Sequence, residues 1–468
     1  MKKLISILLA VMIVLGLCAC GGEGGSEQGG NDASAGLQVG YGRAKIMPTE
    51  SVPLGGYGNG STSRMSEGYL NYLYATCIAF KDGDETILLF NQDTIASRED
   101  ATKIVRDKIT EATGVPGDHI MITATHTHSG PDQDSSHASI ERYNEGPYAT
   151  GFLEAAQTAL ADLTPATLYS TSVEVEGLNF VRHYLMNDGT YYGSNFGSSA
   201  SGIKDYAMEK DDEMILVKAE REGDKKDILL MNWQAHPCFD SNGGKDKNLS
   251  NDYIGAIRDS FESQTDMHFA YVLGATGNMV TDSQIKADEH GLNRDDYGAA
   301  LAKYAIDALP DMQPVEGAGI KITRVMFEAT VNHDDDDKLE QAKEVTDAYS
   351  ESLAYQYGFN SVHEARAIVR RYALPATMDI ELNAFYIGEL AFITAPYEMF
   401  STSAMDIKAR SPFDTTVICT CANEHYSYIP TQAAIDYNSY ESNNSNFVRG
   451  TSETLVDQFV TMLEDLKG

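Results

Sequence analysis

Two histidines stand one residue apart in the segment MITATHTHSGPDQD, residues 121–134. The first part of this segment is apolar enough to form a strand, and on an extended chain residues i and i+2 face the same way. His126 and His128 could therefore point at one place in space. Imidazole is a good zinc ligand, and a catalytic zinc keeps one position open for water. The spacing favours a metal site, while two histidines hydrogen-bonded at a polar turn would give the same pattern.

Two further candidate ligands lie where an apolar run meets a polar turn. His236 follows the run DILLMNWQA and precedes Pro237, which fixes the exit of the chain, with Cys238 next. Glu398 lies in APYEMF, where a predicted strand meets a predicted helix. Taken singly, His236 fits a core histidine, and Glu398 fits a first-turn acid that the helix dipole stabilises.

The elements that must position these residues alternate between strand-length apolar runs and helical patterns, which predicts an α/β fold with mixed β-sheets flanked by helices. Strands are expected around 85–94, 119–125, 167–176, 226–235, 268–273, 318–330, 377–395 and 415–421, and helices around 97–114, 147–163, 252–263, 293–308, 336–357, 399–409 and 452–466. Ser97 is expected to cap the first of these helices and Gly114 to end it. Five strand-like runs end in polar, turn-rich segments. Because ligand sites in open α/β sheets gather in loops beyond strand ends, this predicts one site built from distant pieces.

Composition and charge restrict the partners. The 468 residues include 69 acidic and 35 basic ones, for a formal charge of -34. That charge repels a polyanion and no basic cluster stands out, so nucleic acid is excluded as the expected partner. No low-complexity linker divides residues 37–468, which predicts a single large catalytic domain. Cys77, Cys238, Cys419 and Cys421 lack CxxC spacing and are expected to be mostly small buried residues.

The first residues form an export signal rather than part of the fold. MKK is followed by an apolar stretch and by LCAC, a pattern that resembles a bacterial lipoprotein signal in residues 1–20. Cys20 is then expected to be the lipidated N-terminus of the mature chain, held at the membrane of the bacterial cell envelope on its extracytoplasmic side. Residues 21–36 are rich in Gly and Ser and predict a flexible tether.

Two other hydrolase classes also use an HxH pair. A metallo-β-lactamase-like site requires HxHxDH, whereas His128 is followed by Ser-Gly-Pro. An amidohydrolase barrel requires in addition a bridging lysine, further histidines and a late aspartate, for which Asp282 could stand. Neither class accounts for the other strand-end segments.

Six segments in order resemble the neutral/alkaline ceramidase family along nearly the whole mature chain. They are LGGYGN, THTHSGP at 125–131, NFVR at 179–182, GATGN at 274–278, APYEMF at 395–400 and ANEHYSYIPT at 422–431. HTHSGP is the most specific of them, and the order of the others makes coincidence improbable.

The resemblance implies one Zn²⁺ per chain and names the residues around it. The implied ligands are His126, His236, Glu398 and Tyr428, with Tyr426 as the neighbouring alternative to Tyr428. The implied catalytic residues are His128, Arg182 and Tyr440, and the implied substrate-binding residues are Gly277 and Asn278. Zinc lowers the pKa of a bound water to about 7. His128 would deliver the proton that a departing amine nitrogen needs, because imidazole titrates near neutral pH.

The chain departs from the family pattern at two positions. Val280 stands where the family has a serine, and His425 stands where it has a tyrosine. A lost hydrogen-bonding group can change substrate discrimination by orders of magnitude. These departures affect the expected substrate more than the expected metal.

The leading hypothesis is a lipid-anchored, zinc-dependent hydrolase that cleaves the amide bond of an N-acyl lipid, ceramide or a related compound. One alternative is a lipid-anchored binding protein that keeps the scaffold without turnover, which the missing serine favours. Another is an amidohydrolase or esterase with two metal ions.

Overall fold

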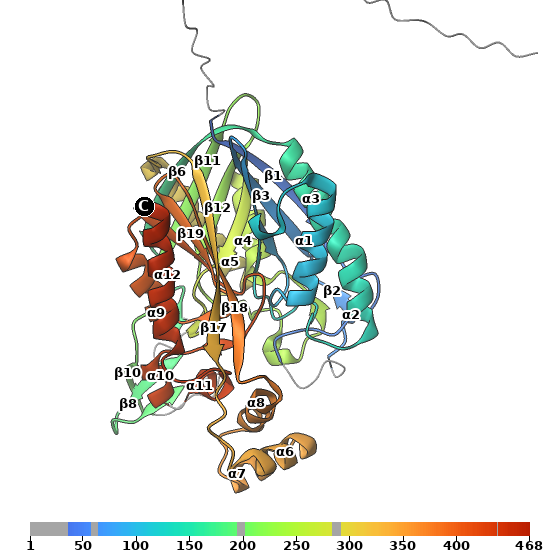
Figure 1. Cartoon of the computed structure of the whole chain (residues 1–468), viewed down its shortest axis with the longest axis vertical. Coiled ribbons are helices and arrows are strands. Elements are labelled where there is room, and N and C mark those ends of the chain that lie inside the picture. Colours follow the sequence, from blue (N-terminus) through green and yellow to red (C-terminus); the bar gives the residue numbers. More distant parts are fainter. Residues whose placement is uncertain (1–35, 58–63, 194–201, 283–291, 438) are drawn as a thin grey trace, which may run out of the picture. The chain divides into compact units, whose positions relative to one another are not determined.

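The computed structural model describes residues 36–57, 64–193, 202–282, 292–437 and 439–468. The described residues belong to one compact unit, Ala35–Gly468, drawn in colour in Figure 1. The predicted signal peptide, Cys20 and all of the predicted tether except its last residue lie outside the described residues. Within the described part of the chain, no helix combines the length and the apolar character needed to cross a bilayer.

A large mixed sheet forms the centre of the fold. Its strands run in the order β14-β12-β11-β6-β1-β3-β4-β5, and β16 pairs with β6. Most neighbours are antiparallel, whereas β12 with β14 and β4 with β5 are parallel. The strands are β1 (Gln38–Lys45), β3 (Tyr74–Asp82), β4 (Glu85–Gln92), β5 (Ile120–Ala124), β6 (Thr164–Glu174), β11 (Glu213–Arg221), β12 (Asp227–Trp233), β14 (Met267–Leu273) and β16 (Gln313–Pro314).

A second sheet of four strands packs on one face of the first. It runs in the order β17 (Ile320–Thr330), β18 (Thr377–Ile387), β19 (Leu390–Thr394) and β21 (Thr415–Cys419). One buried cluster joins the two sheets, with Ile78 and Leu230 of the large sheet packed against Phe385 and Phe392 of the small one. Apolar residues run consecutively along several of these strands, and successive side chains face opposite ways, so each sheet has a second apolar face that helices must cover.

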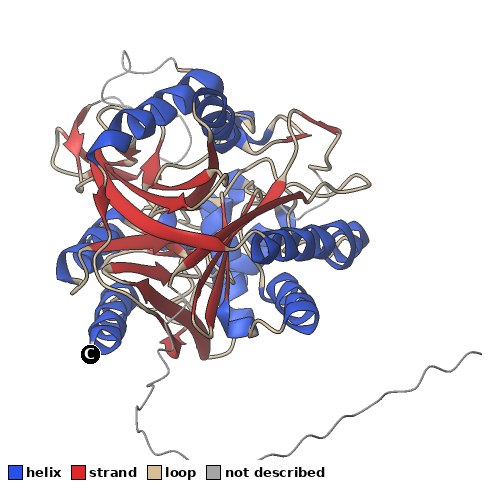
Figure 2. Cartoon of the chain, turned by 90° about the horizontal axis from the view of Figure 1, so that it is seen from above, coloured by secondary structure: helices blue, strands red, loops and turns tan. Residues whose placement is uncertain are grey.

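Helices cover the outer faces of both sheets, as Figure 2 shows. Two pairs cover the large sheet in separate clusters, α1 (Glu99–Thr113) with α3 (Ala149–Ala161), and α4 (Asp252–Gln264) with α5 (Arg294–Ala308). The small sheet is covered by α9 (Ser401–Arg410) and α12 (Thr451–Lys467). The result is a four-layer arrangement, helix, sheet, sheet, helix, which confirms the expected α/β class.

Shorter elements fill the connections. Helices α6 (Leu339–Ala348), α7 (Glu351–Gln356) and α8 (Val362–Ala373) form a small helical group with its own core, seen at the bottom of Figure 1. The remaining helices are α2 (Ala138–Tyr143), α10 (Gln432–Asp436) and α11 (Tyr440–Asn444), and the remaining strands are β2 (Gly68–Tyr69), β7 (Phe180–Val181), β8 (His183–Met186), β9 (Tyr191–Gly193), β10 (Ile203–Tyr206), β13 (Asn248–Leu249), β15 (Met279–Val280), β20 (Glu398–Met399) and β22 (Tyr428–Ile429).

Most predicted elements are present, and the differences have local causes. The helix expected over 336–357 is two helices, because Tyr349 takes a left-handed conformation and Ser350 caps a new start. The strand expected over 377–395 is a hairpin that turns at Gly388, which has a φ of 59°. The prediction that Ser97 caps α1 is wrong, because its hydroxyl instead donates to the carbonyl of Ile122 at 3.0 Å. Gly114 does end α1 in a left-handed turn, as expected.

Three strand ends meet through a single connecting segment after β21. The backbone N–H of Thr420 donates to Leu273 at the end of β14 at 2.9 Å, and that of Asn423 donates to Ile122 of β5 at 2.7 Å. The side chain of Asn423 also accepts from the Ile122 N–H at 2.9 Å. Residues 420–423 therefore connect the end of β21 with the end of β14 and with the middle of β5.

Close packing of α3 on the large sheet depends on glycine. A Cβ added to Gly42 would lie 2.1 Å from the carbonyl oxygen of Ala155 in α3. We expect Gly42→Ala to lower the free energy of unfolding by about 1–3 kcal/mol, because the helix must move away from the sheet. Denaturant unfolding measures this. Gly117→Ala is the matched control, since its new Cβ would have only ordinary contacts from 3.5 Å outward, and an equal loss in both variants would contradict the prediction.

Candidate metal centre

Two histidines and a glutamate from distant strand ends converge at one buried point. His126 follows β5, His236 follows β12, and Glu398 begins β20. The Oε2 atom of Glu398 lies 3.4 Å from Nε2 of His126 and 3.2 Å from Nε2 of His236. All three side chains are at most 5% exposed. The structure thus brings together three of the four ligands that the family resemblance implied.

The hydrogen bonds of the two imidazoles show that this donor set fits a cation. Nδ1 of His126 lies 2.7 Å from the carbonyl oxygen of Ile95, and Nδ1 of His236 lies 2.9 Å from that of Met279. A carbonyl only accepts, so both Nδ1 atoms carry hydrogen, and each ring presents a lone pair on Nε2 whenever it is neutral. Both Nε2 atoms and Oε2 of Glu398 are buried without a hydrogen-bond partner among the described residues. Three acceptors facing one point suit a metal ion such as zinc.

The electrostatics of the group reflect the same convergence. Burial lowers the pKa of His126, but the Glu398 carboxylate outweighs it and raises that pKa well above its ordinary value. The charge of His126 in turn outweighs burial and holds the pKa of Glu398 well below its ordinary value. Burial and the nearby Arg182 lower the pKa of His236 to about 4. Without a metal ion, the site needs a proton to balance the buried carboxylate.

Tyr428, the fourth implied ligand, lies beside Glu398. The two residues are register partners in the short parallel ladder of β20 and β22, so their side chains project from the same face. The Tyr428 hydroxyl accepts a hydrogen bond from Nη2 of Arg182 at 3.3 Å. Burial, followed by the charge of Glu398, raises the pKa of Tyr428 well above its ordinary value.

His128 lies next to this group, although not for the reason that the spacing suggested. Strand β5 ends at Ala124, and His126 has a φ of 65°, so the HTH segment turns instead of staying extended. The two rings still lie close together, with centroids 5.1 Å apart. A non-glycine residue at positive φ costs energy, which the surrounding contacts of the loop must offset.

The ring of His128 faces the metal centre with both nitrogens buried and without a hydrogen-bond partner among the described residues. Burial and the neighbouring imidazoles of His126 and His236 lower its pKa well below the ordinary value. The edge of the Tyr57 ring packs against it with centroids 5.1 Å apart. A Cβ on Gly56, in the LGGYGN segment, would lie 2.4 Å from Nδ1 of His128, so this approach requires glycine.

Arg182 is held in place by a buried charge network. Its Nε lies 2.6 Å from Oε1 of Glu441, and its Nη2 donates to the carbonyl of Gly277 at 2.8 Å. Oε2 of the same glutamate lies 2.8 Å from Nε2 of His183. Glu441 is fully buried, and Arg182 and His183 outweigh that burial and lower its pKa to about 2. Nη2 of Arg182 also donates to the Tyr428 hydroxyl at 3.3 Å, so the guanidinium contacts a candidate metal ligand.

Gly277 and Asn278 shape the site through the backbone. A Cβ on Gly277 would lie 2.6 Å from the carbonyl oxygen of Glu398, so glycine permits the approach to β20. The Asn278 side chain accepts from the backbone N–H of Ser401 at 2.8 Å and donates to its hydroxyl at 3.0 Å. These contacts fix the start of α9 beside Glu398. Direct contact of Gly277 or Asn278 with a substrate stays a prediction.

Tyr440, the remaining implied catalytic residue, stands beside Tyr428 with ring centroids 5.9 Å apart. Burial and Glu398 raise its pKa to about 12, so its hydroxyl keeps its proton at neutral pH. Val280 stands where the family pattern has a serine. It is the last residue of β15 and pairs through its backbone with Phe180 of β7.

Sequence reasoning missed the residues that support the ligands. Glu441 follows Tyr440, and His183 follows Arg182, so adjacency to a candidate was the only available signal. Cys421 and His425 lie near His126, close enough for their donor atoms to form a second candidate group with it. The four described cysteines are free, and Cys77, Cys419 and Cys421 are buried as expected, whereas Cys238 is partly exposed.

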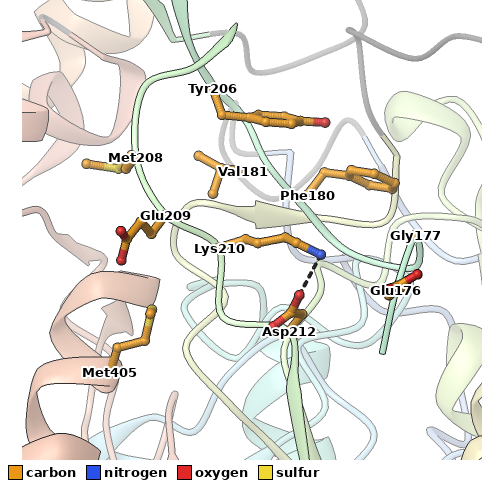
Figure 3. A pocket seen from close by; sticks show the side chains of 10 residues that line it. All are labelled: Glu176, Gly177, Phe180, Val181, Tyr206, Met208, Glu209, Lys210, Asp212 and Met405. Carbon is orange, nitrogen blue, oxygen red and sulfur yellow. Dashed lines mark ion pairs between the residues drawn. The ribbon is translucent and has the colours of Figure 1, made fainter. Parts of the chain in front are cut away.

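A cavity of about 910 Å³ is lined in part by the two residues that precede Arg182, and no candidate ligand or catalytic residue is among its described lining residues. Figure 3 shows Phe180 and Val181, which directly precede Arg182, together with Met208 and Met405 in its wall. Acidic side chains and Lys210 line other parts of it, and Lys210 pairs with Asp212 at 2.7 Å. The sulfur of Met208 lies 3.4 Å from Nδ2 of Asn278, and Met208 packs on Phe400 and Tyr428. One methionine therefore separates the cavity from a candidate metal ligand.

Comparison with known proteins agrees with the fold. A family model for the neutral/alkaline non-lysosomal ceramidase N-terminal domain matches residues 37–289, more than half of the chain. The chain belongs to this family and is, by family and fold, a ceramidase-like hydrolase. No curated protein matches it.

Two solved structures share the fold. Neutral ceramidase from Pseudomonas aeruginosa has 18% sequence identity and a TM-score of 0.69, over 92% of this chain and 74% of that one. A ceramidase complexed with C2 has 15% identity and a TM-score of 0.67, over 92% of this chain and 75% of that one.

The buried pair of Arg182 and Glu441 predicts a dependence of stability on pH. A carboxyl whose pKa is lower in the folded protein stabilises the fold above its unfolded pKa and loses that effect as the pH falls through the folded one. For Glu441 the pKa falls from 4.5 to about 2. The wild type should therefore lose about 3 kcal/mol between pH 5 and 2 through this residue, at about 1.4 kcal/mol per pH unit.

Glu441→Gln tests this, because glutamine cannot ionise. We expect it to be less stable than the wild type by about 3–5 kcal/mol at pH 7, since Arg182 loses its buried counter-charge, and to lack the acid-dependent part of the loss. Urea unfolding at several pH values measures both. Glu111→Gln, on the exposed side of α1, is the control. Parallel stability curves for wild type and Glu441→Gln would contradict the assignment.

Proposed function

We propose that this protein is a zinc-dependent hydrolase that cleaves the amide bond of an N-acyl lipid, with ceramide as the named member of that class. The observation that carries the proposal is the convergence of two Nε2 atoms and one carboxylate oxygen, all buried and without hydrogen-bond partners among the described residues. Such a set has a physical reason to exist when a cation lies between its members. His126, His236, Glu398 and Tyr428 would hold one Zn²⁺.

The residues around the centre have the roles that amide hydrolysis requires. When bound, zinc would supply Lewis-acid polarisation of the carbonyl and a water of lowered pKa. His128 takes the proton of the attacking water and passes it to the departing nitrogen, for which its two unpartnered ring nitrogens are available. Arg182 offers a guanidinium N–H to the oxygen that gains negative charge, and Glu441 holds the guanidinium through its Nε. Tyr440 adds a hydrogen-bond donor to the substrate.

The cavity beside Arg182 would take an aliphatic chain of the substrate. Its wall contains Phe180, Val181, Met208 and Met405, and methionine side chains adapt to chains of different length. An acyl chain and the chain of a long-chain amine share this chemistry. The apolar part of this wall supports a substrate with an aliphatic chain, while Glu176, Glu209, Lys210 and Asp212 line the rest of the cavity.

We also propose that the protein acts from the membrane of a bacterial envelope, on its extracytoplasmic side, tethered through lipid on Cys20. The lipoprotein-like pattern of residues 1–20 supports this. A membrane-tethered enzyme has its N-acyl lipid substrate within reach in the same bilayer.

His236→Ala distinguishes a hydrolase from a binding protein. We expect the variant to lose bound zinc and all measurable hydrolysis of an N-acyl lipid and N-acyl amino acid panel, because one of the converging ligands is gone. Metal analysis and product detection measure this. His137→Ala is the control, since His137 caps α2 away from the centre. If zinc-loaded wild type cleaved no member of the panel yet cleaved esters or phosphodiesters, the amidase assignment would fail. A metal content of about two zinc ions per chain would favour a two-metal enzyme.

Met405→Trp tests the cavity. The indole ring would fill part of it, so kcat/KM should fall about tenfold for long-chain N-acyl substrates and little for N-acetyl ones. Varying the acyl chain and the amine chain in turn shows which of them enters. Met405→Leu, which keeps the volume nearly constant, should retain the wild-type chain-length profile. An unchanged profile in Met405→Trp would place the chain elsewhere.

A further inference from the structure

The two oxygens of Glu398 have different surroundings. Oε2 faces Nε2 of His126 and Nε2 of His236, the candidate ligand atoms. Oε1 lies 3.2 Å from Nε2 of His425. An ionised carboxylate only accepts hydrogen bonds, so Nε2 of His425 carries the hydrogen and donates it. One oxygen is left for a metal ion, while the other is held by a side chain.

Hydrogen bonds of its own backbone fix the position of His425. Its carbonyl accepts from Nη1 of Arg98 at 2.9 Å, and its backbone N–H donates to Glu424 at 2.8 Å. Its side chain is 10% exposed. Two residues further on, the carbonyl of Ser427 accepts the backbone N–H of Glu398 at 2.9 Å. The same short loop therefore fixes both the backbone and the carboxylate of Glu398.

A second metal site is the competing interpretation, because donor atoms of His126, Cys421 and His425 lie within 4.8 Å of one another. The hydrogen bonds argue against it. Nδ1 of His126 is the atom near Cys421, at 3.6 Å from its sulfur, and this nitrogen already donates to Ile95 at 2.7 Å. Its Nε2 faces Glu398 and the first centre. Within the described residues, the second group is left with two ligands.

We propose that His425 is a positioning residue for Glu398. By holding Oε1, it fixes the rotation of the carboxylate so that Oε2 alone points between His126 and His236. Hydrogen bonds to ligating carboxylates of this kind contribute to metal affinity, and their removal typically costs 10–100-fold. This inference rests on the proposed metal site but not on the substrate, so zinc binding tests it without an activity assay.

His425→Phe removes the donor and keeps a ring of similar size. We expect it to weaken Zn²⁺ binding about 10–100-fold in competition with a chromogenic chelator, and to change the visible spectrum of the Co²⁺-loaded protein, because the freed carboxylate can bind through both oxygens. His425→Gln offers an amide N–H to the same oxygen and should recover most of the affinity. His425→Asn is too short to reach it and should behave like His425→Phe without added apolar bulk, which keeps the test valid if the phenylalanine variant does not fold.

His119→Phe is the matched control, because His119 also stands near a carboxylate, Glu85 at 3.8 Å, outside the centre. It should bind zinc as the wild type does. Wild-type affinity in both His425→Phe and His425→Asn, or equal losses in the asparagine and glutamine variants, would overturn the positioning role while leaving the metal site intact. A wild-type protein that binds no zinc would overturn the metal site and this inference together.

Discussion

One constraint organises this structure, namely that a carboxylate and two imidazole lone pairs meet at one buried point. Burying Glu398 is costly unless a positive charge lies beside it. The carbonyls of Ile95 and Met279 hold both rings so that Nε2 faces the carboxylate. The backbone thus places three acceptor atoms around one point, where a cation would balance them. The strained conformation of His126 and the glycines at 56 and 277 follow from bringing the pieces this close.

The four-layer fold provides the rigid support for that meeting point. The candidate ligands come from the ends of β5 and β12 in the large sheet and from β20, which follows β19 of the small sheet. Residues 420–423 connect β5 and β14 with β21 by backbone hydrogen bonds. Since packed sheets and helices barely yield, ligand positions at strand ends are well fixed. A second buried network, Arg182 with Glu441 and His183, fixes the Arg182 guanidinium in the same way.

The residues that differ from the family pattern lie on two sides of the centre. Val280 pairs through its backbone with Phe180, which lines the cavity, so an apolar residue there is consistent with an apolar chain nearby. His425 donates a hydrogen bond to Oε1 of Glu398. The first difference lies beside a residue of the cavity wall, and the second beside a candidate metal ligand.

The sequence by itself determined the fold class, most long strands and helices, and the candidate ligands, because apolar periodicity and strand-end polar motifs are local signals. It failed at the break near Tyr349, at the cap of α1 and in the assumption that HTH stays extended, because single turns depend on φ values that tertiary contacts impose. Only the tertiary structure decided that Glu441 neutralises Arg182 and that His425 holds Glu398. These pairs are separated by 259 and 27 residues, and no local pattern records which distant side chains a folded core brings within hydrogen-bond distance.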